Sequence, residues 1–161
     1  MAYDACASGV IIYAYVLNNP LRFVDPLGLS WTCYYDQALG TIVCYDDETG
    51  EVTHRNYDCY SGKGDDKNKP DSQNKKDKGP ITRGPWDVGN SDSSKGPVTI
   101  DLIPRTGNNV FNTNRGADTF RLHGDSIANP GTASEGCIIC NLNTRNTILQ
   151  NDGSGATIIV Y

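Results

Sequence analysis

Short runs of alternating apolar and polar residues, separated by turn residues, most constrain what this chain can fold into. The clearest lie at 31–36, 41–45, 97–104 and 120–123. Alternation with a period of two places every second side chain on the same face of a β-strand. Long amphipathic helical runs are missing, and 144–150 has room for only one or two helical turns. The sequence therefore predicts a mainly β domain with short helical segments.

The first two runs and a third at 51–57 predict a β-meander, in which Cys33 and Cys44 face each other across the first hairpin. Directly opposed residues have Cβ atoms about 4.5–5.5 Å apart, which suits a disulfide only at a close pair. Two cysteines packed as small apolar side chains fit the pattern equally well. At the other end of the chain, 156–161 predicts a closing central strand, so that loss of the C-terminus would damage the fold.

A polar run follows the meander at 61–79 and contains no large apolar residue that could anchor it in a core. Lysines and aspartates are interleaved along it, and aromatic residues are absent. Segments of this composition gain too little from burial to become ordered. We therefore expect a mobile polar loop.

His123 precedes Cys137 by fourteen positions, and the turn Asn129-Pro130-Gly131 lies between them. Alternation along 120–123 places His123 on the same face as Arg121, and the turn can bring Cys137 back beside the histidine. A thiol is mostly protonated at neutral pH, so a neighbouring base is needed to activate it. The pattern thus predicts a cysteine nucleophile with a histidine base.

Ser134 and Gly136, which precede Cys137, complete the predicted site. The N–H groups of Gly136 and Cys137 are candidates for binding a developing oxyanion, and Gly136 lacks the Cβ that would obstruct substrate. Ser134 is predicted to hold the far nitrogen of the imidazole. Two alternatives remain open, because Cys137 and Cys140 at C-x-x-C spacing also suit a disulfide or half of a zinc site.

The residues His123-Gly124 and Ser134-x-Gly136-Cys137-Ile138 resemble the H-G…S-x-G-C-[IV] signature of the L,D-transpeptidase (YkuD-like) family. Upstream, 79–88 resembles the T-P-x-G-x-[FY]-x-[IV] segment of the same family. The two motifs assign 79–161 as the catalytic half. The resemblance implies an L,D-transpeptidase-like β-sandwich that needs no cofactor and no metal.

The resemblance also implies roles for individual residues. Cys137 would attack a peptidoglycan tetrapeptide, form a thioester and expel D-alanine, with His123, Ser134 and Gly136 assisting. The family usually has arginine directly after Cys-[IV], where this chain has Ile139. Recognition of a substrate carboxylate would therefore fall to Arg121 or Arg145, and Gly124 would be a further substrate-binding residue. The short His–Cys loop resembles a compact subgroup of interbacterial toxins.

The block 12–29 ends in Asp25-Pro26-Leu27-Gly28-Leu29 and resembles the end of the core in Rhs/YD-repeat proteins. In that family the motif closes a β-cage shell and marks where a variable C-terminal toxin begins. The resemblance implies self-cleavage after Leu29, with Asp25 implicated. We therefore expect an Rhs tail at 1–29 and a toxin domain at 30–161, with the Rhs shell of a longer parent protein as a partner.

Charge and hydropathy narrow the possible functions. The 161 residues include 19 acidic and 14 basic side chains, for a net charge of −5, which disfavours nucleic acid as the main partner. The apolar run 10–17 is too short to span a membrane, so no membrane insertion is expected.

The sequence as a whole predicts a secreted antibacterial effector that acts on peptidoglycan stem peptides in the periplasm of target bacteria. Its reaction would be release of D-alanine (L,D-carboxypeptidase), its exchange for another D-amino acid, or both. Delivery would be by type VI secretion, and an immunity protein would protect the producing cell. The alternatives are another cysteine peptidase or amidase of peptidoglycan, and a non-enzymatic β module in which Cys137 is disulfide-bonded.

Overall fold

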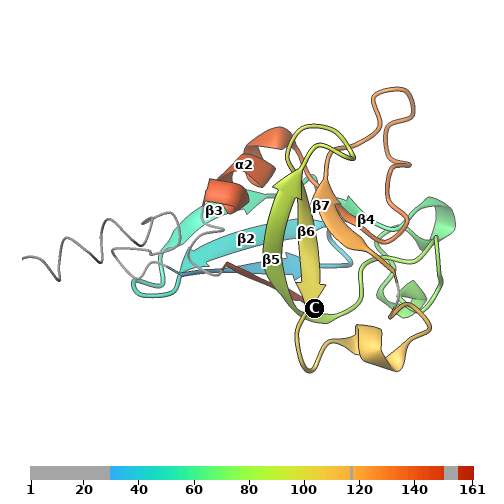
Figure 1. The fold of residues 1–161 in the computed structure, drawn as a ribbon, viewed down its shortest axis with the longest axis horizontal. Coiled ribbons are helices and arrows are strands. Elements are labelled where there is room, and N and C mark those ends of the chain that lie inside the picture. The colour runs from blue at the N-terminus through green and yellow to red at the C-terminus, as the bar shows by residue number, and fades with distance from the viewer. Residues whose placement is uncertain (1–29, 117, 151–155) are drawn as a thin grey trace, which may run out of the picture.

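The computed structural model describes residues 30–116, 118–150 and 156–161 (Figure 1). The predicted Rhs tail, with Asp25 and Leu29, lies outside these residues. The described part is mainly β, as predicted. Its elements are β1 (Trp31–Asp36), β2 (Thr41–Asp46), β3 (Val52–Asn56), β4 (Tyr60–Ser61), η2 (Gly64–Asp66), η3 (Pro70–Ser72), β5 (Gly84–Asp92), β6 (Thr99–Pro104), η4 (Asn109–Asn112), β7 (Phe120–His123), β8 (Ile138–Ile139), α2 (Leu142–Gln150) and β9 (Thr157–Val160).

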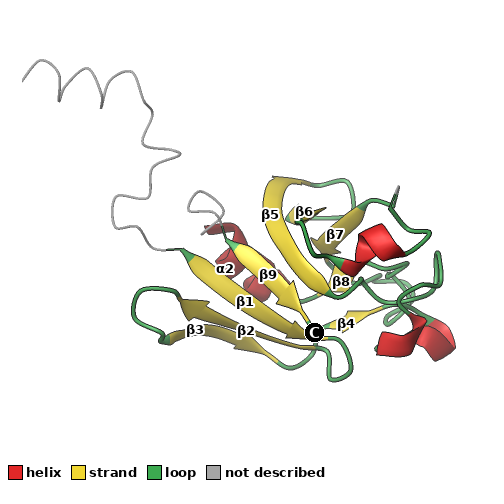
Figure 2. Cartoon of the chain, turned by 90° about the horizontal axis from the view of Figure 1, so that it is seen from below, coloured by secondary structure: helices red, strands yellow, loops and turns green. Residues whose placement is uncertain are grey.

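The nine described strands form one hydrogen-bonded sheet in the order β3-β2-β1-β9-β5-β6-β7-β8-β4. Its two edge strands, β3 and β4, are joined by residues 57–59 alone, so the sheet must curl to bring its edges together. In Figure 2 the part with β1, β2, β3 and β9 lies at an angle to the part with β5 to β8. The curled sheet provides the two β layers that the sandwich prediction required.

Local alternation accounts for most of the strand bounds. β1 and β7 begin and end where the pattern placed them, and β9 lies between β1 and β5 as the predicted central strand. In β6, Ile100 and Leu102 are buried, whereas Ile103 between β-strand neighbours is exposed. The predicted apolar face of β6 thus lies in the core, although Thr99 of the other face is also buried.

Trp86 of β5 lies at the centre of the core. Its side chain has no exposed surface, its ring centroid lies 4.9 Å from that of Phe120, and its Nε1 donates to the carbonyl of Thr82 at 3.0 Å. The core also contains Cys33 and Cys44, which face each other across β1 and β2 and form a disulfide. The register predicted for the first hairpin is confirmed, and of the two alternatives the disulfide is present.

The polar segment 61–79 differs from the expected loose loop. It contains η2 and η3, and it buries Asp66 and Ser72. Asp66 accepts hydrogen bonds from the Ser72 hydroxyl and from Lys75, both at 2.6 Å. The segment therefore has polar contacts that an argument from missing apolar residues overlooks, and its mobility stays a prediction.

The single α-helix of the described residues, α2, begins with an N-cap contact in which the Asn141 side chain accepts from the N–H of Thr144 at 2.9 Å. α2 packs against both β3 and β6, which are separated by four strands in the sheet. The helix therefore occupies the concave side of the curled sheet. Within 30–116, 118–150 and 156–161, no helix has the length and apolar character that a membrane span needs.

Candidate active site

β7 and β8 run parallel, with Leu122 opposite Ile138. This pairing brings the end of β7, which carries His123, next to the loop that carries Cys137. Both side chains line one pocket of about 270 Å³, together with Arg121. The predicted proximity of histidine and cysteine, and the shared face of Arg121 and His123, are present in the structure.

Cys137 is partly buried, and it is the one free cysteine among the described residues. Burial raises the pKa of its thiol, while a hydrogen bond from the Arg121 backbone and the positive charges of Lys95, Arg121 and Arg115 act in the opposite direction. The thiol is thus protonated at neutral pH and needs a base before it can attack.

His123 is suited to be that base. Its Nδ1 lies 2.8 Å from the carbonyl oxygen of Gly124. A carbonyl can only accept, so Nδ1 carries the proton and Nε2 of the neutral ring has a free lone pair. Burial, first of all, lowers the pKa of His123, and the charges of Lys95, Arg145 and Arg121 add to this effect against the hydrogen bond to Gly124. The imidazole is therefore neutral at pH 7.

Ser134 has another role than the one predicted, since the orienting partner of the imidazole is the Gly124 carbonyl. The Ser134 hydroxyl donates to the carbonyl of Cys137 at 2.6 Å. It accepts from the N–H groups of Gly62 and Gly136, at 2.8 and 3.1 Å. Ser134 thus shapes the loop that presents the nucleophile, and the prediction that it holds the histidine is wrong.

The prediction for Gly136 also needs correction. Its N–H is engaged by Ser134 and is not free to bind an oxyanion. The residue has a φ of +131°, and a Cβ at this position would overlap Nη2 of Arg115. Glycine is needed here to make room for that arginine rather than for a substrate. The oxyanion role of the Cys137 N–H stays a prediction.

Arg115 is a site residue that sequence reasoning missed. Its side chain is fully buried and donates to the carbonyls of Gln73, Pro80 and Glu135, at 2.8, 2.6 and 3.2 Å. Its Nε bonds Asp118 at 3.1 Å, so the charge is paired. Arg115 connects the polar segment 61–79 to the cysteine loop. No local signal identified it, because a lone arginine in a polar stretch usually lies in solvent.

The two arginines proposed to bind a substrate carboxylate differ in position. Arg121 lines the pocket, where its Nε bonds Asp101 at 2.9 Å and its Nη1 bonds the Ser94 hydroxyl at 3.2 Å. Arg145 is almost fully buried and donates to the carbonyls of Cys140, Val98 and Pro97.

Neither Arg145 nor Gly124 lines the pocket that contains Cys137. A Cβ on Gly124 would lie 2.8 Å from Nη2 of Arg145, so this glycine leaves space for the guanidinium. The structure thus corrects the substrate-binding assignment of Arg145 and Gly124 and leaves Arg121 as a candidate. The pocket adds charged residues that the sequence did not single out, namely Lys95, Asp77, Asp118 and Glu135.

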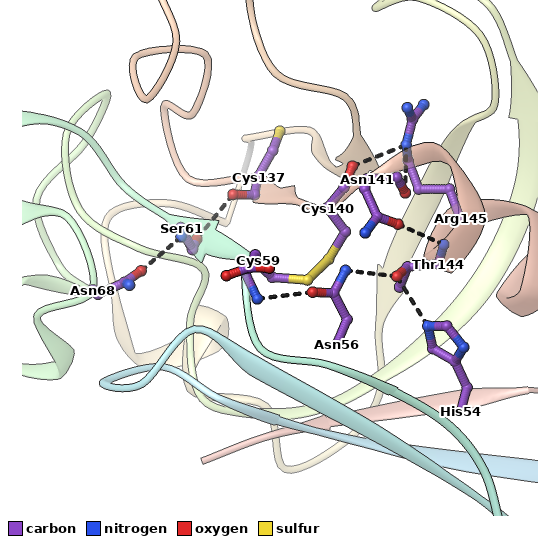
Figure 3. Close-up of a disulfide and its surroundings, with 11 residues drawn as sticks. His54, Asn56, Cys59, Ser61, Asn68, Cys137, Cys140, Asn141, Thr144 and Arg145 are labelled. Atoms are coloured by element: carbon purple, nitrogen blue, oxygen red, sulfur yellow. Dashed lines mark hydrogen bonds between the residues drawn. A yellow bond between two sulfur atoms is a disulfide. The ribbon is translucent and has the colours of Figure 1, made fainter.

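Cys140 forms a disulfide with Cys59 (Figure 3). The side chains of Cys137 and Cys140 point away from each other, as expected for positions three apart in an extended segment. The alternatives of a Cys137–Cys140 disulfide and of half a zinc site are therefore wrong. Across the described ranges, no three or more His, Cys, Asp or Glu residues gather in a way that could hold a metal ion.

Comparison with solved structures finds proteins of similar fold at low sequence identity. The helical cell shape determining protein Pgp2 (K307A mutant) from Campylobacter jejuni is 15% identical, with a TM-score of 0.55 over 81% of this chain and 46% of that chain. Bd1075 from Bdellovibrio bacteriovorus is 15% identical, with a TM-score of 0.55 over 85% and 50%.

An L,D-transpeptidase from Stackebrandtia nassauensis is 14% identical, with a TM-score of 0.48 over 81% of this chain and 55% of that chain. The chain spans about half the length of these three structures. Among curated proteins, none matches this chain.

Residues 55–160, which are more than half of the chain, match the Tlde1 domain. The matched region begins within β3, includes β4, the polar segment, His123 and Cys137, and ends with the last residue of β9. The chain therefore belongs to the Tlde1 domain family, a family of type VI secretion effectors.

Proposed function

We propose that this domain acts on the tetrapeptide stem of peptidoglycan through a thioester on Cys137. The reaction would release D-alanine, exchange it for another D-amino acid, or do both. The observation that carries the proposal is the pocket shared by a free cysteine and a neutral histidine whose Nδ1 is already occupied. Family membership supports an effector that acts on the cell wall.

In the first half of the reaction, His123 Nε2 takes the thiol proton as the sulfur attacks the carbonyl carbon of the third stem residue. The imidazolium then protonates the departing amine of D-alanine, which leaves the acyl group on Cys137 as a thioester. In the second half, Nε2 takes a proton from water or from an incoming amine, which attacks the thioester and restores the thiol. Arg121 and Lys95, which line the pocket, are the candidates to bind a substrate carboxylate.

The site of action and the partners belong to the same proposal. The effector would be secreted through a type VI system and would act in the periplasm of a target bacterium. A cognate immunity protein would occupy the pocket in the producing cell, and the Rhs shell of a parent protein would carry the domain.

Mass spectrometry of purified tetrapeptide muropeptides tests the proposal. Incubation with the wild-type protein should remove one alanine, and Cys137→Ala should leave the muropeptides intact. An added free D-amino acid that replaces the alanine would demonstrate exchange. Cleavage at another bond would favour a different cysteine peptidase or amidase, whereas intact muropeptides with a reactive Cys137 would refute the substrate assignment.

A further inference from the structure

Three consecutive residues, Cys59-Tyr60-Ser61, contact the nucleophile region from a distant part of the sequence. Tyr60 and Ser61 form β4, which pairs antiparallel with β8 directly after Cys137. Each of the three side chains contacts a different part of the segment between His123 and Cys140. Figure 3 shows Ser61 next to Cys137, and Cys59 bonded to Cys140.

Ser61 holds the backbone of the nucleophile. Its hydroxyl is fully buried and lies 2.9 Å from the carbonyl of Cys137 and 3.2 Å from that of Gly136. It accepts the N–H of Ile81 at 2.7 Å. The Cys137 carbonyl also accepts from Ser134, so two hydroxyls share its two lone pairs. The peptide plane that follows Cys137 is therefore fixed from both sides.

Tyr60 braces the loop between histidine and cysteine. Its hydroxyl donates to Asp125 at 2.6 Å near the start of the loop and accepts from the N–H of Ala133 at 3.1 Å near its end. Asp125 also accepts from the N–H of Gly131 at 2.7 Å. The ammonium of Lys67 lies 4.0 Å above the Tyr60 ring. One hydroxyl thus links the two ends of the loop.

Cys59 fixes the far side of β8. Its disulfide partner Cys140 donates its N–H to the carbonyl of His123 at 3.1 Å, so the bonded cysteine is also hydrogen-bonded to the base. The N–H of Cys59 in turn donates to Gly40 at 3.0 Å. Through Cys59 the disulfide therefore links β8 and the end of β7 to the turn between β1 and β2.

We propose that Cys59-Tyr60-Ser61 is a positioning segment that sets the orientation of Cys137 toward His123. The inference rests on the proposed function, because it takes Cys137 as the nucleophile. None of the three residues lines the pocket, so they act through the backbone of Cys137 and the loop before it. Their loss should lower the rate of turnover and leave substrate binding nearly unchanged.

The first test compares Ser61→Ala with Ser72→Ala. Both remove a buried serine hydroxyl, and that of Ser72 bonds Asp66 away from the pocket. We expect Ser61→Ala to lower kcat about 10- to 100-fold, because small misplacements of reacting groups cost rates of this order. KM should change less than twofold by the same reasoning, since ground-state contacts remain. Ser72→Ala should keep the wild-type kcat at a similar loss of thermal stability.

The second readout is alkylation of Cys137 by iodoacetamide across pH, followed by intact-protein mass spectrometry. Loosening of the loop exposes the thiol, so its pKa should fall toward the ordinary value in Ser61→Ala and in Tyr60→Phe. These variants should therefore alkylate faster at pH 7 while they turn over more slowly. Mere destabilisation, as in Ser72→Ala, does not produce this opposite pair of changes. Ser61→Thr, which keeps the hydroxyl, should restore the wild-type profile.

The role of Cys59 is tested by removing its disulfide, with removal of the other disulfide as the matched control. The double variant Cys59→Ala/Cys140→Ala should change the alkylation profile and lower kcat, whereas Cys33→Ala/Cys44→Ala should leave both unchanged. Wild-type kcat and alkylation in Ser61→Ala, Tyr60→Phe and Cys59→Ala/Cys140→Ala would overturn the inference. Because alkylation needs no stem peptide, it still decides the inference if the wild-type protein releases no alanine and the proposed function fails.

Discussion

At the scale of single residues, the chemistry of the pocket depends on which polar atoms are already engaged. His123 has one nitrogen bound to the Gly124 carbonyl, so only Nε2 remains to accept a proton. Ser134 and the N–H of Gly136 are engaged with each other. Arg115 is paired with Asp118 and four carbonyls, whereas Arg121 and Lys95 line the pocket with it. The hydrogen bonds thus distinguish the groups that are free to react from those that hold the structure.

The pH dependence of activity follows from the environment of His123. Burial lowers the pKa of the imidazole, so the neutral base persists below its ordinary pKa of 6.5. We expect kcat/KM to be unchanged just below pH 7 and to fall at lower pH, with the midpoint of the fall below pH 6.5. Rates of alanine release between pH 4.5 and 8 measure this fall. A midpoint at or above 6.5 would mean that the base is more solvated than the structure indicates.

Gly136→Ala should disrupt the site, because a Cβ there would overlap Nη2 of Arg115 and the φ of +131° disfavours L-residues. We expect a free energy of unfolding lower by about 1–3 kcal/mol and loss of most activity. Gly50→Ala is a suitable control for the strain alone, since Gly50 also has a positive φ but an open surrounding. Urea unfolding and alanine release check both. Equal losses in the two variants would show that contact with Arg115 is unimportant.

At the scale of elements, the polar segment 61–79 and the strand β9 contribute in different ways. The segment has its own polar contacts and supplies the carbonyls of Gln73 and Gly79 to Arg115, which also bonds the Glu135 carbonyl in the cysteine loop. β9 joins the two parts of the sheet, because it pairs in parallel with β1 and antiparallel with β5.

Limited proteolysis checks whether the polar segment is ordered. It contains several lysines, so a mobile loop would be cut rapidly by trypsin. We expect the wild-type segment to resist cleavage and Asp66→Asn to be cut faster, because the variant weakens the contacts with Lys75 and Ser72. Asp71→Asn, on an exposed residue of the same segment, is the control. Rapid cleavage of the wild-type chain at 61–79 would show that the segment is a mobile loop.

Two adjacent isoleucines test the role of β9. Ile158 is fully buried between Cys33 of β1 and Trp86 of β5, whereas Ile159 is only partly buried. Ile158→Ala should lower the free energy of unfolding by about 2–5 kcal/mol, as expected for a large-to-small change in a core. Ile159→Ala should cost clearly less. Urea denaturation measures both values, and similar losses would place the two side chains in equivalent surroundings.

At the scale of the whole molecule, the sheet curls so that its edge strands β3 and β4 can be joined by only three residues. The two disulfides close loops of different length. Cys33–Cys44 spans 11 positions within one hairpin, and Cys59–Cys140 spans 81 positions and lies beside the neighbouring strands β4 and β8. The longer loop restricts the unfolded chain more. The Cys59–Cys140 bond should therefore stabilise the folded state more than the Cys33–Cys44 bond does.

Removal of each disulfide should reveal this difference. The chain-entropy estimate gives about 3 kcal/mol for the shorter loop and about 4.5 kcal/mol for the longer one at 25 °C. We expect Cys59→Ala/Cys140→Ala to lose more stability in urea than Cys33→Ala/Cys44→Ala. An equal or reversed order would indicate that packing around the hairpin disulfide outweighs loop closure.

The sequence by itself predicted several of the strands and the proximity of His123 and Cys137. Alternation fixed β1 and β7 and the opposition of Cys33 and Cys44, because strand periodicity and hairpin register are local properties. It also placed Arg121 and His123 on one face, before a turn that returns the chain to Cys137.

Only the tertiary structure decided the contacts between distant segments. These include the Cys59–Cys140 bond, the buried Arg115, the polar contacts within 61–79 and the partners of Ser134. Local patterns carry no record of such pairings, since each polar or cysteine side chain has many possible partners in sequence. Its actual partner is set when the curled sheet brings β4, β7 and β8 together and buried polar groups must find partners.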